Sequence, residues 1–374
     1  MTLLDADWLT PSGWQRGHLH LQDGRIVALD AQPIAASEAG SGGRLRGLPG
    51  FIDTHVHGGG GRDSMEGAEA LDVMARLHAR HGTTALLATT MTAPLAEIEA
   101  ALRAFAPACA ARRPGAARVL GVHLEGPYLN PERLGAQPDH ILPAALAEVQ
   151  RLHALAPIRV LTLAPELPGH LALIGPLRDL GIRVQIGHSN ADYDTGCAAL
   201  AAGAAGFTHL FNAMTPLHHR APGLVGAALA HAQHAELIPD LLHVHPGAMR
   251  AALRAIPGLF CVTDATAAAG MPEGDYQLGG QPVRLCQGGV RLPDGTLAGS
   301  ALTMDQALRH LVQIGLPLED AARRVSTLAA EFLGLPDRGR IAAGAWADLV
   351  LLDEALQVRR VVVEGEEVHV HPDA

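Results

Sequence analysis

The sequence predicts an α/β protein in which a (β/α)₈ TIM-type barrel carries a small β-sandwich domain built from both chain ends. Three observations support this fold. Eight apolar runs of strand length alternate with alanine- and leucine-rich segments of helical spacing. Strand-like pieces precede the first run and return after the last helix. Histidines and carboxylates stand where several of the runs end, as the residues of a barrel site do.

The chain ends have strand and turn character. We expect residues 1–48 and 335–374 to pair as one small β domain beside a barrel that spans residues 49–334. The strand-like pieces at the two ends are 14–21, 24–29, 348–352 and 358–363.

Between these ends the pattern is that of a parallel barrel. The apolar runs are 50–57, 83–92, 119–128, 160–166, 183–190, 206–214, 236–244 and 259–267. Segments such as 68–80 and 94–111 have helical spacing between them, and two closing helices are predicted at 301–314 and 317–333.

The amino-acid composition argues against several classes of protein. With 48% hydrophobic and 18% charged residues in 374, the chain can build a large core and is not of the disordered type. A net charge of -10 argues against a nucleic-acid partner. An apolar span of about 18 residues, which a membrane helix needs, does not occur, and the N-terminal residues lack a basic region followed by an apolar run. The four cysteines lie far apart, so we expect no disulfides. Together these features lead us to expect a soluble cytoplasmic protein.

The chain contains no lysine, because all 28 basic residues counted as Lys or Arg are arginine. Schiff-base chemistry, pyridoxal phosphate attachment and a P-loop lysine are therefore excluded. A carboxylated lysine that bridges two metal ions is excluded as well.

Two histidines one residue apart end the first run, in the stretch GFIDTHVHGGGG. In a strand, residues i and i+2 point to the same side, so His55 and His57 face the same way. Imidazole is the commonest metal ligand, and two on one strand can hold one ion. The alternative is that both histidines are structural residues of the core. The residues at the other strand ends distinguish between these two interpretations.

Residues of matching chemistry follow four later strands. They are Glu125 in HLEGP, His188 in GHSN, His209 in THLFNAM and Asp264 in VTDAT. Because catalytic residues of a barrel gather at the carboxyl ends of its strands, we expect these side chains to converge with His55 and His57. The sequence therefore predicts a metal site.

Histidine and carboxylate ligands without sulfur suit a catalytic Zn²⁺ or Fe²⁺. Such ions polarise a carbonyl and activate water, and Glu125 can bridge two of them. Asp264 can take a proton from water and return it to a leaving amine. We expect hydrolysis of an amide or a related C–N bond, with one or two ions per chain.

The motifs resemble a known family. PGFIDTHVHG resembles the signature of the amidohydrolase superfamily, which implies a barrel of the amidohydrolase kind. The motifs HLEGPYLNPERLGAQ, GHSNADY, THLFNAM, RAPGLVG, VTDAT and LAGSALTM together resemble the N-acetylglucosamine-6-phosphate deacetylases. The resemblance covers nearly the whole chain, including the split β domain.

The resemblance implies roles for the matching residues. The implied metal ligands are Glu125, His188 and His209 at a main site and His55 and His57 at a second site, which some members lack. Asp264 matches the catalytic acid/base.

The implied substrate contacts are Ala136, Gln137, Asn212, Ala213, Arg220, His243, Leu297, Ala298 and Gly299. Of these, Arg220 and His243 match phosphate binders. Two positions depart from the pattern, since Gln137 is His in some members and Leu241 stands where Gly is common.

The implied activity is hydrolysis of N-acetyl-D-glucosamine 6-phosphate to D-glucosamine 6-phosphate and acetate, by a homodimer in amino-sugar catabolism. One alternative is a deacetylase for N-acetylgalactosamine 6-phosphate or another amidohydrolase for an N-acyl substrate. A metal-binding protein without turnover is a further alternative, and the presence of Asp264 argues against it.

Overall fold

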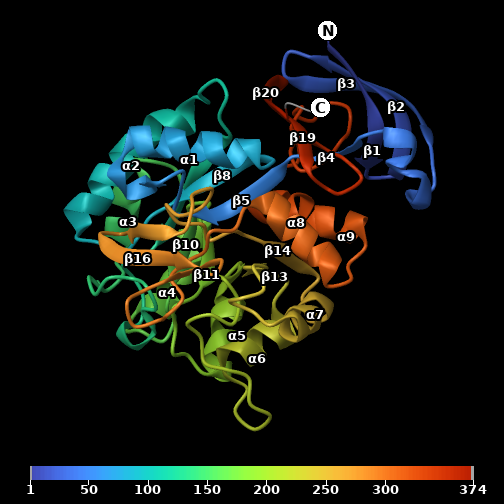
Figure 1. The fold of residues 1–374 in the computed structure, drawn as a ribbon. Helices are drawn as coiled ribbons and strands as arrows, with labels where there is room; N and C mark the ends of the chain where they lie inside the picture. Colours follow the sequence, from blue (N-terminus) through green and yellow to red (C-terminus); the bar gives the residue numbers. More distant parts are fainter. Residues whose placement is uncertain (1, 372–374) are drawn as a thin grey trace.

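The computed structural model describes residues 2–371, so residues 1 and 372–374 of the predicted small domain lie outside the described residues. Parallel strands at all eight predicted places surround the centre of the larger part of the molecule (Figure 1). The barrel strands are β5 (Phe51–Val56), β8 (Thr83–Thr89), β9 (Arg118–Glu125), β10 (Ile158–Leu163), β11 (Arg183–Ile186), β12 (Gly206–Phe207), β13 (His234–Leu237) and β14 (Gly258–Cys261). Every residue of β5 and β8 is buried, as expected for strands covered on both faces.

A helix follows each barrel strand and packs outside it. These helices are α1 (Ala68–Arg80), α2 (Leu95–Ala110), α3 (Leu146–His153), α4 (His170–Asp179), α5 (Tyr193–Ala202), α6 (Gly223–His231), α7 (Pro246–Ala255) and α8 (Met304–Gln313). The buried positions of α1 recur at three- and four-residue spacing, which gives the helix one apolar face toward the barrel. Among residues 2–371, no helix combines the length and apolar character that a membrane crossing requires.

The barrel closes through backbone hydrogen bonds beyond the regular strands. Six strands form one parallel sheet in the order β12-β11-β10-β9-β8-β5, and β13 pairs with β14. On one side, Asp264 N donates to His55 O at 2.9 Å and His57 N donates to Ala265 O at 2.8 Å. On the other side, Leu210 N donates to Glu236 O at 2.9 Å. The strand ends that carry the predicted site residues are thereby fixed to one another.

Two small sheets lie beside the barrel mouth. The glycine-rich stretch forms a short hairpin of β6 (Gly58–Gly59) and β7 (Arg62–Asp63). A three-stranded meander of β15 (Gly274–Leu278), β16 (Gln281–Cys286) and β17 (Gly289–Arg291) is inserted after β14. The sequence pattern predicts neither of these two sheets.

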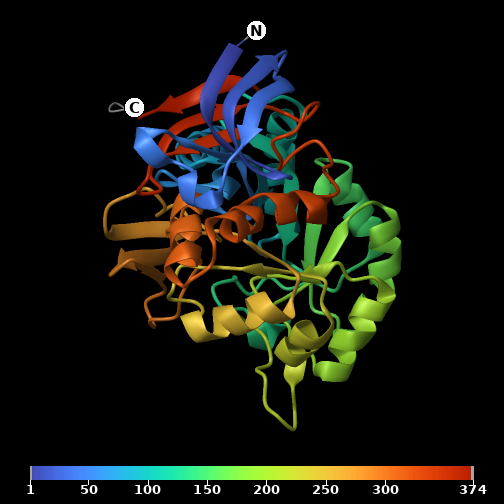
Figure 2. The ribbon, with the colours of Figure 1, turned by 90° about the vertical axis from the view of Figure 1, so that its right-hand side faces the viewer.

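Both chain ends form one seven-stranded sheet, in the order β20-β19-β18-β4-β1-β2-β3 (Figures 1 and 2). Its strands are β1 (Thr2–Thr10), β2 (Gly13–Gln22), β3 (Arg25–Pro33), β4 (Arg46–Pro49), β18 (Leu349–Leu352), β19 (Val358–Val363) and β20 (Glu366–Val370). The edge strand β3 also contacts the segment before β18, because Ile26 N donates to Ala345 O at 2.9 Å. The fold class is thus confirmed, whereas the domain boundaries after residues 48 and 334 stay a prediction.

One predicted closing helix is in fact two. The segment predicted as a helix over 317–333 forms α9 (Leu318–Val325) and α10 (Thr327–Leu333). Ser326 between them has a non-helical backbone, with φ -143° and ψ -79°. Its hydroxyl donates to Gly50 O at 2.6 Å, so a contact with the first barrel strand accompanies the break.

Candidate active site

Three residues from separate strand ends converge at the main predicted metal site. Glu125 is the last residue of β9, and His188 and His209 follow β11 and β12 closely. Glu125 Oε1 lies 3.2 Å from the Nε2 atoms of both histidines. These two Nε2 atoms are 3.0 Å apart, and all three side chains are buried. The geometry matches a group that could hold a metal ion.

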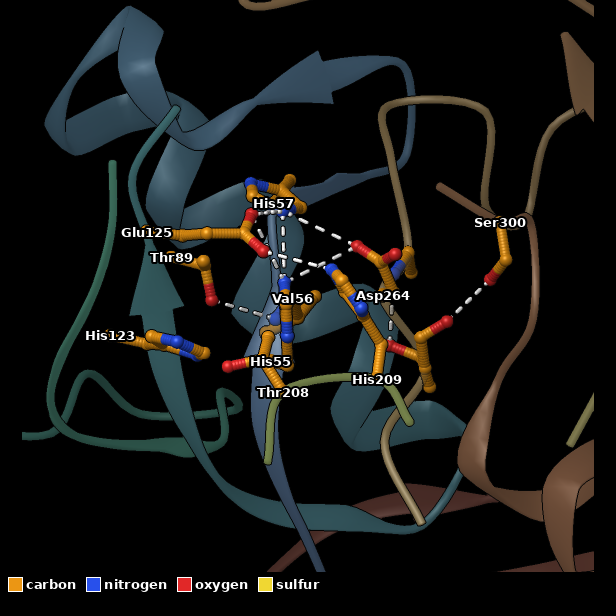
Figure 3. A network of polar contacts seen from close by, with 12 residues as sticks. His55, Val56, His57, Thr89, His123, Glu125, Thr208, His209, Asp264 and Ser300 are labelled. Carbon is orange, nitrogen blue, oxygen red and sulfur yellow. Dashed lines mark hydrogen bonds and ion pairs between the residues drawn. The ribbon is translucent and has the colours of Figure 1, made fainter. Parts of the chain in front are cut away.

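The second predicted pair adjoins this cluster. His55 Nε2 and His57 Nε2 are 3.2 Å apart, so the two imidazoles do face the same side (Figure 3). Glu125 Oε2 lies 3.1 Å from His57 Nε2 and 3.4 Å from His55 Nε2. One carboxylate therefore faces both histidine pairs, one oxygen to each, as a bridging ligand would.

Asp264 lies across the same space from Glu125 (Figure 3). Its Oδ1 is 3.3 Å from His57 Nε2 and 3.4 Å from His55 Nε2. Ser300 N donates to Asp264 O at 2.7 Å, which, with the bond to His55 O, fixes its backbone on both sides.

Three of these residues have unusual backbone conformations. His188, His209 and Asp264 have φ values of 46°, 28° and 49°, in the left-handed region that residues other than glycine rarely adopt. Such conformations cost free energy and persist only where the surroundings hold them in place. Their concentration here marks these strand ends as a functional site.

The donor set fits a divalent cation. The Nδ1 atom of His188 donates to Arg133 O at 2.8 Å, so in the neutral ring Nε2 carries a lone pair. That Nε2 atom lies 3.0 Å from His209 Nε2 and 3.2 Å from Glu125 Oε1, a buried oxygen that has no hydrogen bond from any described residue. Two imidazole nitrogens and an unpaired carboxylate oxygen so close together suit a positive ion.

The electrostatics agree with that fit. Burial raises the pKa of Asp264, but the imidazoles of His55 and His57 outweigh burial and lower this pKa to about 2. Burial also opposes ionisation of Glu125, yet His55, His188 and His209 hold its pKa well below the usual value. The carboxylates in turn raise the pKa of His57 to about 9 against the effect of its burial. A cation would replace the protons that the cluster otherwise attracts.

A cavity of about 340 Å³ opens above the cluster. It brings together most of the predicted site residues. Those that line it are His57, Glu125, Ala136, Gln137, His188, His209, Asn212, Ala213, His243, Asp264, Leu297 and Gly299.

Three predicted residues do not line this cavity. His55 is fully buried beneath its floor. Ala298 is buried in a small core with Met91 and Leu278, so it supports the loop rather than facing a ligand. Arg220 is exposed in the loop before α6, where its Nη1 lies 2.7 Å from His219 Nε2.

The two positions that depart from the family pattern are both well defined. Gln137 Oε1 accepts from Thr92 N at 2.7 Å, and Gln137 Nε2 donates to Glu125 Oε2 at 2.7 Å. The amide orientation is thereby fixed, with its NH₂ group at the cavity. Leu241 has φ 66°, the left-handed conformation that favours glycine, and it is not among the described residues that line the cavity.

His243 lines the cavity and is held in place by a neighbouring carboxylate. Its Nδ1 lies 2.6 Å from Asp240 Oδ2. Burial lowers the pKa of His243, but Asp240 more than compensates and raises it. The raised pKa favours the protonated, positively charged ring, which suits a residue that binds a phosphate.

The structure adds residues that the sequence analysis missed. Arg133 lines the cavity, with Nε and Nη2 donating to Asn190 Oδ1 at 3.0 and 2.9 Å. Glu236 lies below the cluster, 3.0 Å from His55 Nδ1. The sequence signal that could have identified Glu236 is a carboxylate within the strand segment HAEL, most of which is buried, because a buried charge needs a partner.

Comparisons with known proteins agree with this geometry. The chain is 41% identical to the N-acetylgalactosamine-6-phosphate deacetylase of Escherichia coli O157:H7, over 96% of each chain. It is 40% identical to the N-acetylglucosamine-6-phosphate deacetylase of Lysinibacillus sphaericus, over 92% of this chain and 91% of that one.

A solved structure of similar sequence has the same fold. It is a mutant N-acetyl-D-glucosamine-6-phosphate deacetylase from Mycobacterium smegmatis in complex with N-acetyl-D-glucosamine-6-phosphate. The two chains are 36% identical and superpose with a TM-score of 0.91 over 99% of each. The sequence profile of the amidohydrolase family matches residues 47–368. With most of its length matched and its strand-end histidines and carboxylates in place, this chain belongs to the amidohydrolase family.

Proposed function

We propose that the protein hydrolyses N-acetyl-D-glucosamine 6-phosphate to D-glucosamine 6-phosphate and acetate. One observation carries the proposal: an ionised Asp264 faces His55 and His57, next to Glu125, in a cavity of sugar size. The names of the similar proteins supply the substrate class.

We propose that Glu125, His188 and His209 hold one Zn²⁺ or Fe²⁺ and that His55, His57 and Glu125 hold a second. When bound, such an ion supplies a Lewis acid that polarises the acetyl carbonyl and makes water more acidic.

The chain's own residues supply the proton transfer. Asp264 accepts the proton of the attacking water as the C–O bond to the acetyl carbon forms. Asp264 then returns that proton to the sugar nitrogen as the C–N bond breaks, which releases the free amine and acetic acid, and the acid loses the water's second proton to solvent to give acetate. Gln137 presents an amide N–H of fixed orientation next to Glu125, where the acetyl group would lie.

For the phosphate end, His243 is one donor and Arg220 the other. Because Arg220 does not reach the cavity of its own chain, we propose that it binds the phosphate in a partner's cavity, within a homodimer. Since sugar phosphates do not cross membranes unaided, we propose a cytoplasmic location.

A second candidate substrate has the other epimer of the sugar. The similar protein from E. coli O157:H7 is an N-acetylgalactosamine-6-phosphate deacetylase, so that substrate belongs in the same test.

The test measures free amine and acetate release from both N-acetylhexosamine 6-phosphates, with metal analysis of the same sample. The proposal expects equal amounts of amine and acetate, with the larger kcat/KM on the glucosamine epimer. A larger kcat/KM on the other epimer would select the second candidate. Absence of amine release from both by the metal-loaded protein would reject the proposal.

A further inference from the structure

Glu236 is a charged residue in a place where charge is costly. It belongs to the barrel strand β13, and its side chain is fully buried. A buried carboxylate needs partners, and Glu236 has three. Its Oε2 lies 3.0 Å from His55 Nδ1 and 3.3 Å from the backbone N of His209, and its Oε1 accepts from Thr54 Oγ1 at 3.1 Å.

Glu236 could be read as a ligand of a third ion, because it forms a compact group with His55 and His123. The contacts of His123 argue against that. Its Nδ1 lies 3.0 Å from Thr54 O and its Nε2 2.7 Å from Thr162 Oγ1, so both ring nitrogens are engaged. His123 therefore has no lone pair to offer, and Glu236 acts on His55 instead.

The contact with Glu236 sets the tautomer of His55. A carboxylate accepts a hydrogen bond, so the proton of the neutral ring lies on Nδ1 and the lone pair lies on Nε2. That lone pair faces Glu125 and His57. His57 lacks such support, since none of the described residues bonds its Nδ1. The second site thus depends on one oriented imidazole, and Glu236 orients it.

We propose that Glu236 is the positioning residue that sets how strongly the His55–His57 site takes up its metal ion. The inference rests on the proposed metal-dependent function, but it concerns ion affinity rather than turnover. Its hydrogen bond to His209 N touches only the backbone of the main site, so the main ion should be affected less.

The experiment is a Zn²⁺ titration of metal-free protein, with affinity and stoichiometry measured by calorimetry and elemental analysis. Glu236→Ala removes the acceptor. Glu236→Gln keeps the shape and one acceptor oxygen but loses the charge. Glu331→Gln is the matched control, because Glu331 is an exposed glutamate away from the cavity. Changes to residues that support metal ligands typically weaken affinity by about 10–100-fold.

The expected result is a loss of that size for the second ion in Glu236→Ala, a smaller loss in Glu236→Gln, and less than about threefold change for the first ion. Equal weakening of both ions, unchanged affinity in both variants, or a single ion in the wild type would overturn the proposal. If Glu236→Ala does not fold, as judged by circular dichroism, Glu236→Gln decides alone. Failure of the proposed function is distinguishable, because a chain that binds two ions without deacetylating either sugar keeps this inference.

Discussion

The two ends of the cavity are built in different ways. At the inner end, Glu125, Asp264 and the histidines are buried, come from five strand ends of one chain, and are held by short contacts. At the proposed phosphate end, which we call the outer end, His243 is anchored by Asp240, whereas Arg220 lies exposed outside the cavity. This difference supports the proposal that one chain supplies all the proposed catalytic and metal-binding residues, whereas binding of the phosphate draws on a second chain.

We expect catalysis at the inner end to be sensitive to the replacement of a single side-chain atom. We expect Asp264→Asn to keep its metal and its fold but to lose roughly 10²–10⁴-fold in kcat, because an amide cannot carry the proton. Steady-state kinetics with elemental analysis check this. The control Asp294→Asn changes an exposed aspartate and should be neutral. Near-normal kcat in Asp264→Asn would show that proton transfer does not depend on this carboxylate.

The outer end should respond in KM rather than in kcat. A charge-assisted hydrogen bond contributes roughly 1.5–3 kcal/mol, so we expect Arg220→Ala to raise KM for the sugar phosphate by roughly 10–100-fold. Slow turnover of unphosphorylated N-acetylglucosamine should hardly change. Arg254→Ala, at an exposed arginine on α7, is the matched control. Equal losses on both substrates would assign Arg220 a structural role.

Mixing the two variants tests whether the ends come from different chains. A dimer of one Arg220→Ala chain and one Asp264→Asn chain has one cavity with both native residues. At substrate concentrations far below the KM of Arg220→Ala, we expect equal amounts of the variants to regain about one quarter of the wild-type activity, since half of the dimers are mixed and each has one working site. Mixed dimers confirmed by mass that remain inactive would place Arg220 in its own chain's site.

Metal content distinguishes the two proposed ion sites at the inner end. We expect the double change His55→Ala/His57→Ala to lower the metal from about two ions per chain toward one, because Glu125, His188 and His209 remain. Elemental analysis after saturation with Zn²⁺ measures this. One ion in both the wild type and the variant would contradict the two-ion arrangement.

The last expected effect concerns folding stability rather than catalysis, at a residue that supports the inner end. His78 Nε2 lies 2.9 Å from Gly58 O in the glycine hairpin, and burial lowers the pKa of His78 from 6.5 to about 4. Between these pH values the unfolded chain binds the proton and the folded chain does not, so stability falls as pH falls. The loss for this group approaches about 3 kcal/mol near pH 4.

Comparison with His78→Gln isolates this loss, because glutamine can donate to Gly58 O but does not titrate. We expect the unfolding free energy of the variant to fall less than that of the wild type between pH 6.5 and 4. Parallel pH profiles from urea unfolding would rule out the assignment.

Much of the inner end follows from sequence, because strand-end positions in a parallel barrel are dictated by topology. His55, Glu125 and Asp264 lie in motifs at predicted strand ends, and the structure brings them together. The position of Arg220 and the contact of Glu236 with His55 were not predictable, because each depends on how distant segments pack.

The glycine hairpin shows the same limit. The four glycines Gly58–Gly61 predict that the backbone can approach a ligand closely, and this stays a prediction. The structure shows close packing of two loops at the same place, because a side chain at Gly58 would lie 2.6 Å from Ala267 N. The pattern of residues predicted a tight approach but not the approaching partner.

The order of strands in the terminal sheet has a consequence for biosynthesis. β4 lies between β1, which precedes it, and β18, which starts at residue 349. At roughly 5–20 residues per second, a ribosome needs about 15–60 s to make the roughly 300 residues that separate these two strands. During that time β4 has an open edge while the barrel emerges, and an open strand edge invites pairing with other chains. A nascent chain stalled before residue 349 should therefore be the form of this protein most prone to aggregate.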